Sequence, residues 1–398
     1  MKKLAIINQR YGLEVNGGSE YYTRLIAEHL NKYYDVEVLT TTALDYNTWA
    51  EYYSQGNDIV NGVKVKRFSV EHPRNMMRFS IASKLIRIFN KFGIHLDKWW
   101  VKEQGPCVQK LISYIKENKM KYDVFIFVTY LYYTTVMGLP EVADKAILIP
   151  TAHDEPYIYF SIYKKLFKQP KAFIFLTEEE KNFVRETFRN ENIPYEVIGV
   201  GIDIPEKFQD NKTNEEAVSK FRQKYNITSK YVIYAGRVDY GKKCDEMISY
   251  FARFKEKHPN HGIQLVIIGK DMMGIPKHRD IRQLGFVSDE DKYAGIAGAE
   301  YLWLPSQFES LSIALLEAMA LGVPVIVNGK CKVLKGHCKK SSAGVYYNSY
   351  EEFEKEFMKV GCADDTYFFM SKAAKLYVKK YYQWDVVEKQ LQSIIELQ

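Results

Sequence analysis

Short apolar runs alternate with polar, helix-like segments along most of the first half of the chain. Most of these runs are short and carry little charge, which is typical of a strand buried inside a parallel sheet. The runs cover residues 4–8, 36–41, 63–68, 123–129, 146–150, 172–176 and 197–200. Two helix starts are recognisable between them: Ser19 follows a Gly-Gly pair, and Thr177 precedes three glutamates. The alternation predicts parallel strands joined by helices.

A polar and charged stretch, residues 203–230, interrupts this alternation. The pattern then starts again, with strand-like runs at residues 231–235, 264–268, 282–287, 301–305 and 323–327. A length of 398 residues exceeds what one hydrophobic core usually spans. We therefore expect an α/β protein with two doubly wound, Rossmann-like domains that divide near residue 205.

Residues 74–100 depart from the alternation and predict a basic amphipathic helix. Apolar side chains recur at helical spacing, basic side chains lie on the neighbouring face, and a tryptophan pair follows. These residues are Met77, Ile81, Leu85, Ile88 and Phe92; Lys84, Arg87 and Lys91; and Trp99 and Trp100. Two interpretations stay open. The helix packs its apolar stripe on the domain, or it lies on an anionic membrane.

Composition limits the cell compartments and the classes of binding partner that we expect. The net charge of +7 is modest for this length, and no nucleic-acid recognition module accompanies it, so we expect no nucleic-acid partner. The five cysteines are few, which disfavours a disulfide framework and favours a reducing compartment. The apolar run at residues 4–7 is too short for a signal peptide, and no window is long enough to span a bilayer. We expect a cytoplasmic protein, at the inner face of the cell membrane if residues 74–100 bind lipid.

The segment 305–327 is predicted to form a strand, loop, helix, turn and strand, and it carries two glutamates. Glu309 lies in the loop at a strand's carboxyl end, where ligands bind in such sheets. Glu317 lies in an apolar helix, where a carboxylate needs a partner such as a ribose or sugar hydroxyl. A solvated Glu317 and a surface Glu309 are the alternative. The loop that opens the helix, whose free N–H groups attract anions, ends in Ser310, Leu311 and Ser312.

A basic pair follows the strand-like run at residues 231–235. Arg237 and Lys242 there could hold a diphosphate without a metal and stabilise charge on a leaving phosphate. An exposed basic turn is the alternative. In the first half, Gly17 and Gly18 precede a helix and let the backbone approach a ligand closely. They do not form the dinucleotide-binding glycine fingerprint, so hydride chemistry loses support.

His153 follows a buried run and is predicted to lie at that strand's carboxyl end, with a structural role as the alternative. Two other patterns could suggest a metal site. Acids at residues 289–291 follow Ser288, and a first helical turn explains them. The other pattern has a spacing that matches no common zinc site and consists of Cys331, His337 and Cys338. We therefore expect no metal.

Together these motifs resemble the GT-B fold retaining glycosyltransferases of the large glycogen-synthase-like and mannosyltransferase-like family. Glu309 and Glu317 fit the family's paired-glutamate motif, and Arg237 and Lys242 fit its diphosphate clamp. Lys243 stands where many members carry glycine. Further matching segments are GGSE, HDE, VIGVGID, IIGK, LGFVSDEDKYAGIAGAE and the final YYQWDVVEKQLQSII. The resemblance covers nearly the whole chain and is weakest over residues 45–120.

The resemblance implies two Rossmann-like domains that face each other across a cleft. Residues 1–205 would form the acceptor-side domain, and residues 206–380 would bind the nucleotide sugar. The final helix, residues 381–398, would pack back on the first domain.

The resemblance also implies a role for each motif. Arg237 and Lys242 would hold the donor diphosphate, and Glu317 would bind the ribose hydroxyls. Glu309 would hold the hydroxyls of the transferred sugar, and residues 285–287 would touch the base through their backbone. The residues implied at the reaction centre are Glu309, His153, Arg237 and Lys242. The implied donor-binding set is Gly17, Gly18, Arg237, Lys242, Gly285, Phe286, Val287, Glu309, Ser310, Leu311, Ser312 and Glu317.

The implied activity is that of a retaining, metal-independent hexosyltransferase without a cofactor. Its co-substrate would be a nucleoside-diphosphate sugar, UDP- or GDP-linked, and its acceptor a saccharide or a lipid-linked saccharide in bacterial surface polysaccharide synthesis. Two alternatives stay open: a noncatalytic adaptor subunit that keeps the fold, and a GT-B-shaped nucleotide-sugar epimerase.

Overall fold

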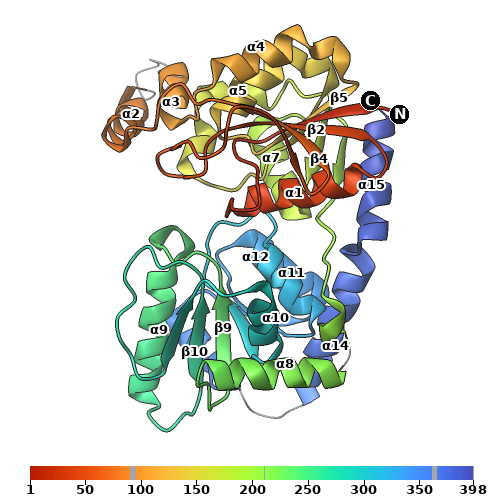
Figure 1. The fold of residues 1–398 in the computed structure, drawn as a ribbon. Helices are drawn as coiled ribbons and strands as arrows, with labels where there is room; N and C mark the ends of the chain where they lie inside the picture. The colour runs from red at the N-terminus through yellow and green to blue at the C-terminus, as the bar shows by residue number, and fades with distance from the viewer. Residues whose placement is uncertain (90–95, 210, 361–364, 398) are drawn as a thin grey trace. The chain divides into compact units, whose positions relative to one another are not determined.

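The computed structural model describes residues 1–89, 96–209, 211–360 and 365–397. The chain divides into two compact units, with residues 1–200 and 387–398 in unit 1 and residues 201–386 in unit 2. In each unit, helices flank the strands of one sheet (Figure 1). Apolar strand sequences, buried on both faces, place the hydrophobic core on both sides of each sheet.

Unit 1 is built on an eight-stranded sheet in the order β3-β4-β2-β1-β5-β6-β7-β8. Neighbouring strands pair in parallel, except that β3 and β4 are antiparallel. The strands are β1 Lys3–Ile7, β2 Asp35–Thr41, β3 Gly56–Val60, β4 Val63–Phe68, β5 Val124–Val128, β6 Ala146–Ile149, β7 Ala172–Phe175 and β8 Tyr195–Val197. The α-helices are α1 Gly18–Leu30, α2 Met76–Phe89, α3 Asp97–Gln104, α4 Gln109–Glu117, α5 Tyr133–Gly138, α6 Ser161–Leu166 and α7 Glu178–Phe188.

Unit 2 is built on a six-stranded parallel sheet in the order β11-β10-β9-β12-β13-β14. Its strands are β9 Tyr231–Ala235, β10 Gln264–Ile268, β11 Ile281–Gly285, β12 Tyr301–Leu304, β13 Val325–Asn328 and β14 Gly344–Tyr347. The α-helices that follow α7 are α8 Asn211–Lys224, α9 Cys244–Lys257, α10 Asp289–Ala297, α11 Ile313–Ala320, α12 Lys332–Ser341, α13 Tyr350–Phe357, α14 Asp365–Tyr381 and α15 Trp384–Glu396. Two parallel, Rossmann-like sheets are thus present, as predicted.

Two edge strands lack the apolar signature and were not predicted. β3 is polar and largely exposed, and β14 is only half-buried along most of its length. An edge strand contacts the core through fewer side chains than a central strand does, so its sequence carries a weaker apolar pattern. The predicted cap of the first helix was also wrong, because Gly17 rather than Ser19 precedes the first helical turn. The predicted Thr177 cap of α7 is confirmed, since its hydroxyl accepts a bond from the Glu180 N–H.

Of the apolar stripe predicted in residues 74–100, Leu85 is half-buried and three further residues do not pack on unit 1. Met77, Ile81 and Ile88 of α2 are exposed, whereas Ala82 and Ile86 form the buried face of the helix. The predicted Phe92 and Lys91 lie outside the described residues. Within the described parts of the chain, no helix is both long and apolar enough to cross a membrane.

The end of the chain is anchored in unit 1 through Glu388 of α15. Its carboxylate contacts three side chains at the end of α1 and just after it: His29 Nδ1 at 2.6 Å, Lys32 Nζ at 3.1 Å and the Tyr33 hydroxyl at 2.7 Å. These contacts bind the second turn of α15 to the end of the first helix.

The carboxyl ends of β9 and β10 approach each other closely at two glycines. The N–H of Gly236 donates to the Ile268 carbonyl at 2.9 Å, and the N–H of Gly269 donates to the Gly285 carbonyl at 2.8 Å. A Cβ atom on Gly269 would lie 1.9 Å from the Gly236 carbonyl oxygen. Gly269 also has a φ of +131°, which side chains rarely tolerate. The loop after β9 therefore depends on a glycine in the neighbouring strand end.

A fully buried carboxyl group connects the ends of β6 and β7. Glu180, in the first turn of α7, accepts hydrogen bonds from the backbone N–H of Ala152 at 2.5 Å and of Leu176 at 2.6 Å. Burial raises the pKa of Glu180 from 4.5 to about 8, although both backbone bonds lower it. Ala152 directly precedes His153, so this carboxyl group fixes the loop that carries the histidine.

Gly269→Ala should lower the melting temperature much more than Gly274→Ala. Both positions have positive φ, so an alanine costs backbone strain of the order of 1–3 kcal/mol at either. Only Gly269 adds a clash, because nothing lies within 4 Å of a Cβ at Gly274. Thermal unfolding of the two variants tests this, and equal losses would mean that the contact between the strand ends is not tight.

Glu180→Gln should change how stability depends on pH. Between the ordinary pKa of 4.5 and the folded-state pKa of about 8, the folded protein holds a proton that the unfolded chain releases. The contribution of Glu180 to the free energy of unfolding therefore falls as pH rises through this window. Because glutamine does not titrate, the stability of the variant relative to wild type should increase from pH 5 to pH 8. Denaturant unfolding at both pH values measures this, and a constant difference would contradict it.

Candidate functional site

The predicted donor-binding residues of unit 2 gather at one edge of its sheet. Because β9, β10, β11 and β12 run in parallel, their carboxyl ends lie together. Arg237 and Lys242 follow β9, and Glu309 follows β12, which is the strand next to β9. Strand pairing thus brings together residues that are far apart in the sequence.

Lys242 and Glu309 form an ion pair. Lys242 Nζ lies 2.7 Å from Glu309 Oε1, and the two side chains are 32% and 16% exposed. Lys242 ends a 3-10 turn, Tyr240–Lys242, which Asp239 caps by accepting the Lys242 N–H at 2.8 Å. The turn therefore aims the lysine at the loop that follows β12.

Arg237 shares Asp239 with this turn. Its Nε donates to Asp239 Oδ2, while the Tyr234 hydroxyl donates to the Arg237 carbonyl at 2.7 Å. The guanidinium side chain is half exposed, so a ligand can reach it. Arg237 and Lys242 supply two cations, and Asp239 and Glu309 supply two anions, so the cluster is close to neutral. A phosphate group at this position would compete with the two carboxylates for the cations.

Glu317 is buried within unit 2 and has protein partners that the sequence did not indicate. Its Oε1 lies 2.8 Å from Lys292 Nζ and accepts a bond from the Tyr293 hydroxyl at 3.1 Å, both from α10. Its side chain is only 6% exposed, so the alternative of a solvated Glu317 is wrong. A buried carboxylate needs such partners, because removal of the charge from water is costly. The sequence feature that could have indicated these partners is the Lys292-Tyr293 pair, which directly follows the acids of α10.

The loop before α11 has an unusual backbone conformation. Ser312 precedes the first helical residue with a φ of +74°, which is rare for a residue other than glycine. Leu311 is buried, and its carbonyl oxygen is 3.0 Å from Nε2 of His337 on α12. Ser310 lies between Glu309 and Leu311 in the sequence. The sequence did not predict His337 as a partner of this loop.

The residues predicted to touch the base follow β11. Gly285 has a φ of +68° and accepts a hydrogen bond from the Gly269 N–H, and Phe286 is exposed. Val287 comes next and precedes Ser288, whose hydroxyl caps α10 by accepting from the Asp291 N–H at 3.1 Å. The acids at residues 289–291 are therefore the first turn of a helix, as predicted.

In the described parts of the chain, no group of three or more His, Cys, Asp and Glu side chains has an arrangement that could hold a metal ion. The ring nitrogens of His337, which the sequence places near Cys331 and Cys338, contact the Leu311 carbonyl and the Tyr377 hydroxyl. Burial raises the pKa of the Cys331 thiol to about 11 and of the Cys338 thiol to about 12.

In unit 1, Gly17 and Gly18 open α1 above a buried ion pair. A Cβ on Gly17 would lie 2.2 Å from Glu20 Oε2, whereas a Cβ on Gly18 would meet nothing within 4 Å. Glu20 Oε1 accepts bonds from Arg10 Nε and from Gln9 Nε2, both at 2.9 Å. Gly17 is thus required by its own neighbour. The sequence missed this pair, although Arg10 and Gln9 follow the first apolar run directly.

His153 lies in the loop after β6. Its Nε2 is 3.6 Å from Glu155 Oε1, which also accepts a hydrogen bond from the buried Tyr130 at 2.6 Å. Burial raises the pKa of Glu155, but the bonds from His153 and Tyr130 and the His153 charge outweigh it and lower the pKa overall. His153 is partly exposed, and its predicted contact with the transferred sugar stays a prediction.

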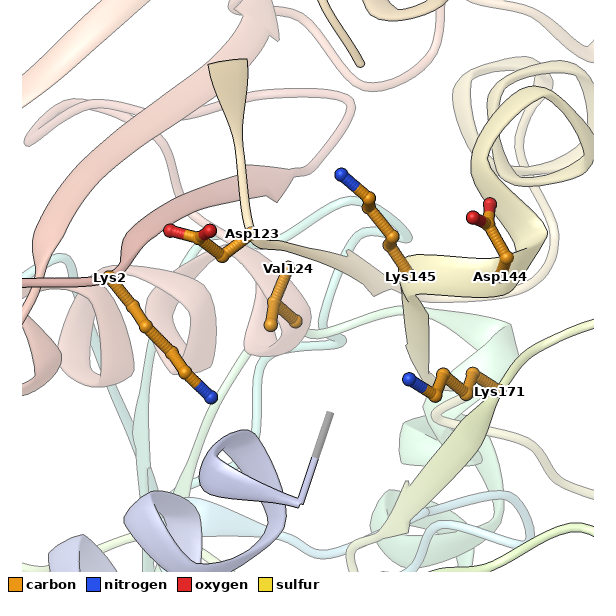
Figure 2. Close-up of a pocket in the computed structure, with 6 residues that line it drawn as sticks. All are labelled: Lys2, Asp123, Val124, Asp144, Lys145 and Lys171. Atoms are coloured by element: carbon orange, nitrogen blue, oxygen red, sulfur yellow. The ribbon is translucent and has the colours of Figure 1, made fainter. Parts of the chain in front are cut away.

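A pocket of about 370 Å³ lies at the opposite edge of the unit 1 sheet, at the amino ends of β1, β5, β6 and β7 (Figure 2). It contains none of the predicted site residues. Its lining consists of Lys2, Asp123, Val124, Asp144, Lys145 and Lys171. Lys145 is held by the carbonyls of Lys119 and Tyr122, and Lys2 contacts the end of α15. Lys2 and Lys145 therefore connect the amino ends of these strands to neighbouring segments of the chain.

Solved structures share this fold over the whole chain. Sucrose-phosphate synthase from Thermosynechococcus elongatus has a TM-score of 0.70 at 13% identity, covering 100% of this chain and 99% of that one. HepE from Anabaena, solved in complex with UDP, has a TM-score of 0.71 at 13% identity and full coverage of both chains. WaaG, involved in lipopolysaccharide biosynthesis, has a TM-score of 0.64 at 16% identity, covering 97% and 98%. The two Rossmann-like units therefore have the architecture of the GT-B fold.

Sequence comparisons bear on the enzyme class. Residues 217–360 match the family Glycosyl transferases group 1. An uncharacterized glycosyltransferase of Methanocaldococcus jannaschii is 25% identical over 345 residues, covering 82% of this chain and 80% of the relative. Mannosylfructose-phosphate synthase of Agrobacterium fabrum is 24% identical over 217 residues, covering 48% and 47%. Fold and sequence together support a glycosyltransferase of the GT-B fold that carries a group 1 domain in unit 2.

Proposed function

We propose that this chain is a retaining, metal-independent glycosyltransferase that moves a hexosyl group from a nucleoside-diphosphate sugar to a saccharide acceptor. The observation that carries the proposal is the cluster of Arg237, Lys242 and Glu309 at the carboxyl edge of the group 1 domain. Two cations in this position suit a diphosphate, and a carboxylate beside them suits sugar hydroxyls.

Groups of the bound donor would replace contacts that are already made within unit 2. Its phosphates would draw Arg237 away from Asp239 and Lys242 away from Glu309, which would free the Glu309 carboxylate for the sugar. The ribose hydroxyls would donate to Glu317, and the backbone of residues 285–287 would contact the base. The sugar hydroxyls would replace Lys242 as partners of Glu309, while Asp239 would keep the backbone N–H of Lys242 as its donor.

The chemistry follows from where charge develops. As the bond between the sugar and the phosphate breaks, the anomeric carbon becomes positive and the leaving diphosphate gains negative charge. Arg237 and Lys242 would stabilise the leaving diphosphate, a task that a bound metal ion performs in other enzymes. The acceptor hydroxyl would attack from the same face and give its proton to the leaving phosphate oxygen, so the configuration at the anomeric carbon is retained.

The acceptor is proposed to be a lipid-linked saccharide in bacterial surface polysaccharide synthesis, reached at an anionic membrane. The α2 surface supports the membrane part of this proposal; it consists of Met76, Met77, Ile81 and Ile88 with Arg78 and Lys84, all exposed. Helix α2 contains no acidic residue. Exposed apolar side chains beside basic ones, without acids, match the chemistry of an anionic bilayer surface.

A thermal-shift screen against UDP, GDP, ADP, CDP and their sugars, run without added metal and again with EDTA, tests the donor site. Because a ligand of the folded state raises the melting temperature, we expect one base to stabilise the protein without metal. Stabilisation that disappears with EDTA would contradict metal independence. A protein that binds no nucleotide would support the adaptor alternative instead.

Lys242→Met should weaken binding of the preferred nucleoside diphosphate by about 10- to 100-fold, since loss of a hydrogen bond to a charged group costs about 1.5–3 kcal/mol. Lys243→Met is the matched control, because it removes the same charge from the adjacent position. Lys243 has a positive φ, and methionine takes its place there without a change of backbone. Calorimetric titration of both variants distinguishes a specific contact from a general charge effect. Equal losses would mean that Lys242 does not touch the diphosphate.

Met77→Glu should reduce flotation of the protein with phosphatidylglycerol vesicles, because it places a negative charge in the α2 surface. Met120→Glu is the control, since Met120 is also highly exposed and lies between two lysines but belongs to no apolar stripe. Phosphatidylcholine vesicles should bind neither variant nor the wild type. A wild-type protein that stays at the bottom of the gradient with anionic vesicles would contradict the membrane contact.

A further inference from the structure

His337 makes two hydrogen bonds inside unit 2, one through each ring nitrogen. Nε2 lies 3.0 Å from the carbonyl oxygen of Leu311, and Nδ1 lies 3.0 Å from the hydroxyl oxygen of Tyr377. A carbonyl oxygen can only accept, so Nε2 carries the proton and Nδ1 accepts from the tyrosine hydroxyl. The imidazole is 2% exposed. Burial, with the charge of Lys340, lowers its pKa to about 4, so this neutral tautomer persists at ordinary pH.

The Leu311 carbonyl determines where the next N–H points. The peptide bond between Leu311 and Ser312 is trans, so its C=O and N–H groups point in opposite directions. The carbonyl points inward, to a buried imidazole. The N–H of Ser312 therefore points away from His337, on the loop that joins Glu309 to α11.

This peptide orientation needs external support. Ser312 has a φ of +74° and a ψ of +85°, a strained conformation for a residue other than glycine. A flip of the peptide would turn the carbonyl toward the outside and the N–H toward the interior. An outward carbonyl would repel a phosphate where an outward N–H would bind it.

We propose that His337 is a positioning residue for the donor diphosphate: it holds the Leu311 carbonyl so that the Ser312 N–H faces the phosphate. This proposal rests on the proposed donor site of unit 2. Tyr377 on α14 extends the support, because its hydroxyl holds Nδ1 and lies 3.3 Å from the Tyr382 hydroxyl. Two segments distant in sequence, α12 and α14, thus set the direction of one backbone amide.

Two substitutions at His337 separate its two bonds. In His337→Gln, the side-chain amide reaches about as far as Nε2 and can still donate to Leu311. In His337→Asn, the shorter amide can still meet Tyr377 but cannot reach the Leu311 carbonyl. UDP and GDP are titrated calorimetrically into both variants and the wild type. We expect His337→Asn to lose about 10- to 100-fold in affinity for whichever nucleotide the wild type prefers, and His337→Gln to stay within about threefold.

Hydrogen exchange over residues 306–316 supplies a readout that needs no nucleotide. We expect faster amide exchange in His337→Asn than in the wild type, and wild-type exchange in His337→Gln. Melting temperatures are measured alongside, because a purely structural role for the buried imidazole would lower the stability of both variants and change affinity equally.

The outcomes are distinguishable. A wild-type protein that binds neither UDP nor GDP contradicts the proposed donor site, and the exchange experiment then still decides whether His337 orders the loop. Normal nucleotide binding by the wild type with equal affinities for both variants overturns the positioning role. Unchanged exchange of residues 306–316 in His337→Asn overturns it as well.

Discussion

Parallel pairing of β9, β10, β11 and β12 is the constraint on which the candidate site depends. It places the ends of these strands at one edge, so that loops separated by tens of residues can share a ligand. The close approach of Gly236 and Gly269 keeps two of these ends in contact. Without this edge, Lys242 and Glu309 would have no reason to meet, because 67 positions separate them in the chain.

The second recurring constraint is the cost of a buried charge. Glu20 and Glu317 each have a cation and further hydrogen-bond donors within reach. Glu180 is held by two backbone N–H groups instead, and burial raises its pKa although both of these bonds lower it. Two of these carboxylates lie beside loops predicted to bind the donor: Glu20 under Gly17, and Glu317 in the helix after Ser312. Buried electrostatics and loop geometry are therefore coupled in both units.

The sequence predicted what local pattern encodes. Apolar runs gave the central strands, and Thr177 and Ser288 gave helix starts, because strand burial and capping depend on residues close in the chain. The edge strands β3 and β14 were not predicted, because one face of an edge strand can stay polar. The partners of Glu317 and Leu311 were not predicted for another reason. Lys292, the partner of Glu317, and His337, the partner of Leu311, each lie about 25 positions away in the sequence, and only the folded chain brings them near. The apolar stripe of α2 was recognised from the sequence, but helical periodicity alone does not show which face of the helix packs on the domain.

The near-neutral cluster of Arg237, Lys242, Asp239 and Glu309 has a consequence for selectivity among anions. Free cations would attract every small anion in the surroundings, inorganic phosphate and nucleoside triphosphates included. Here each cation already has an internal counter-ion, which acts as a standing competitor. An incoming anion must displace Asp239 and Glu309 together, so a bridging diphosphate with a sugar attached gains more than a single phosphate does. In the proposed donor site the two carboxylates would therefore disfavour a single phosphate relative to a diphosphate with a sugar attached.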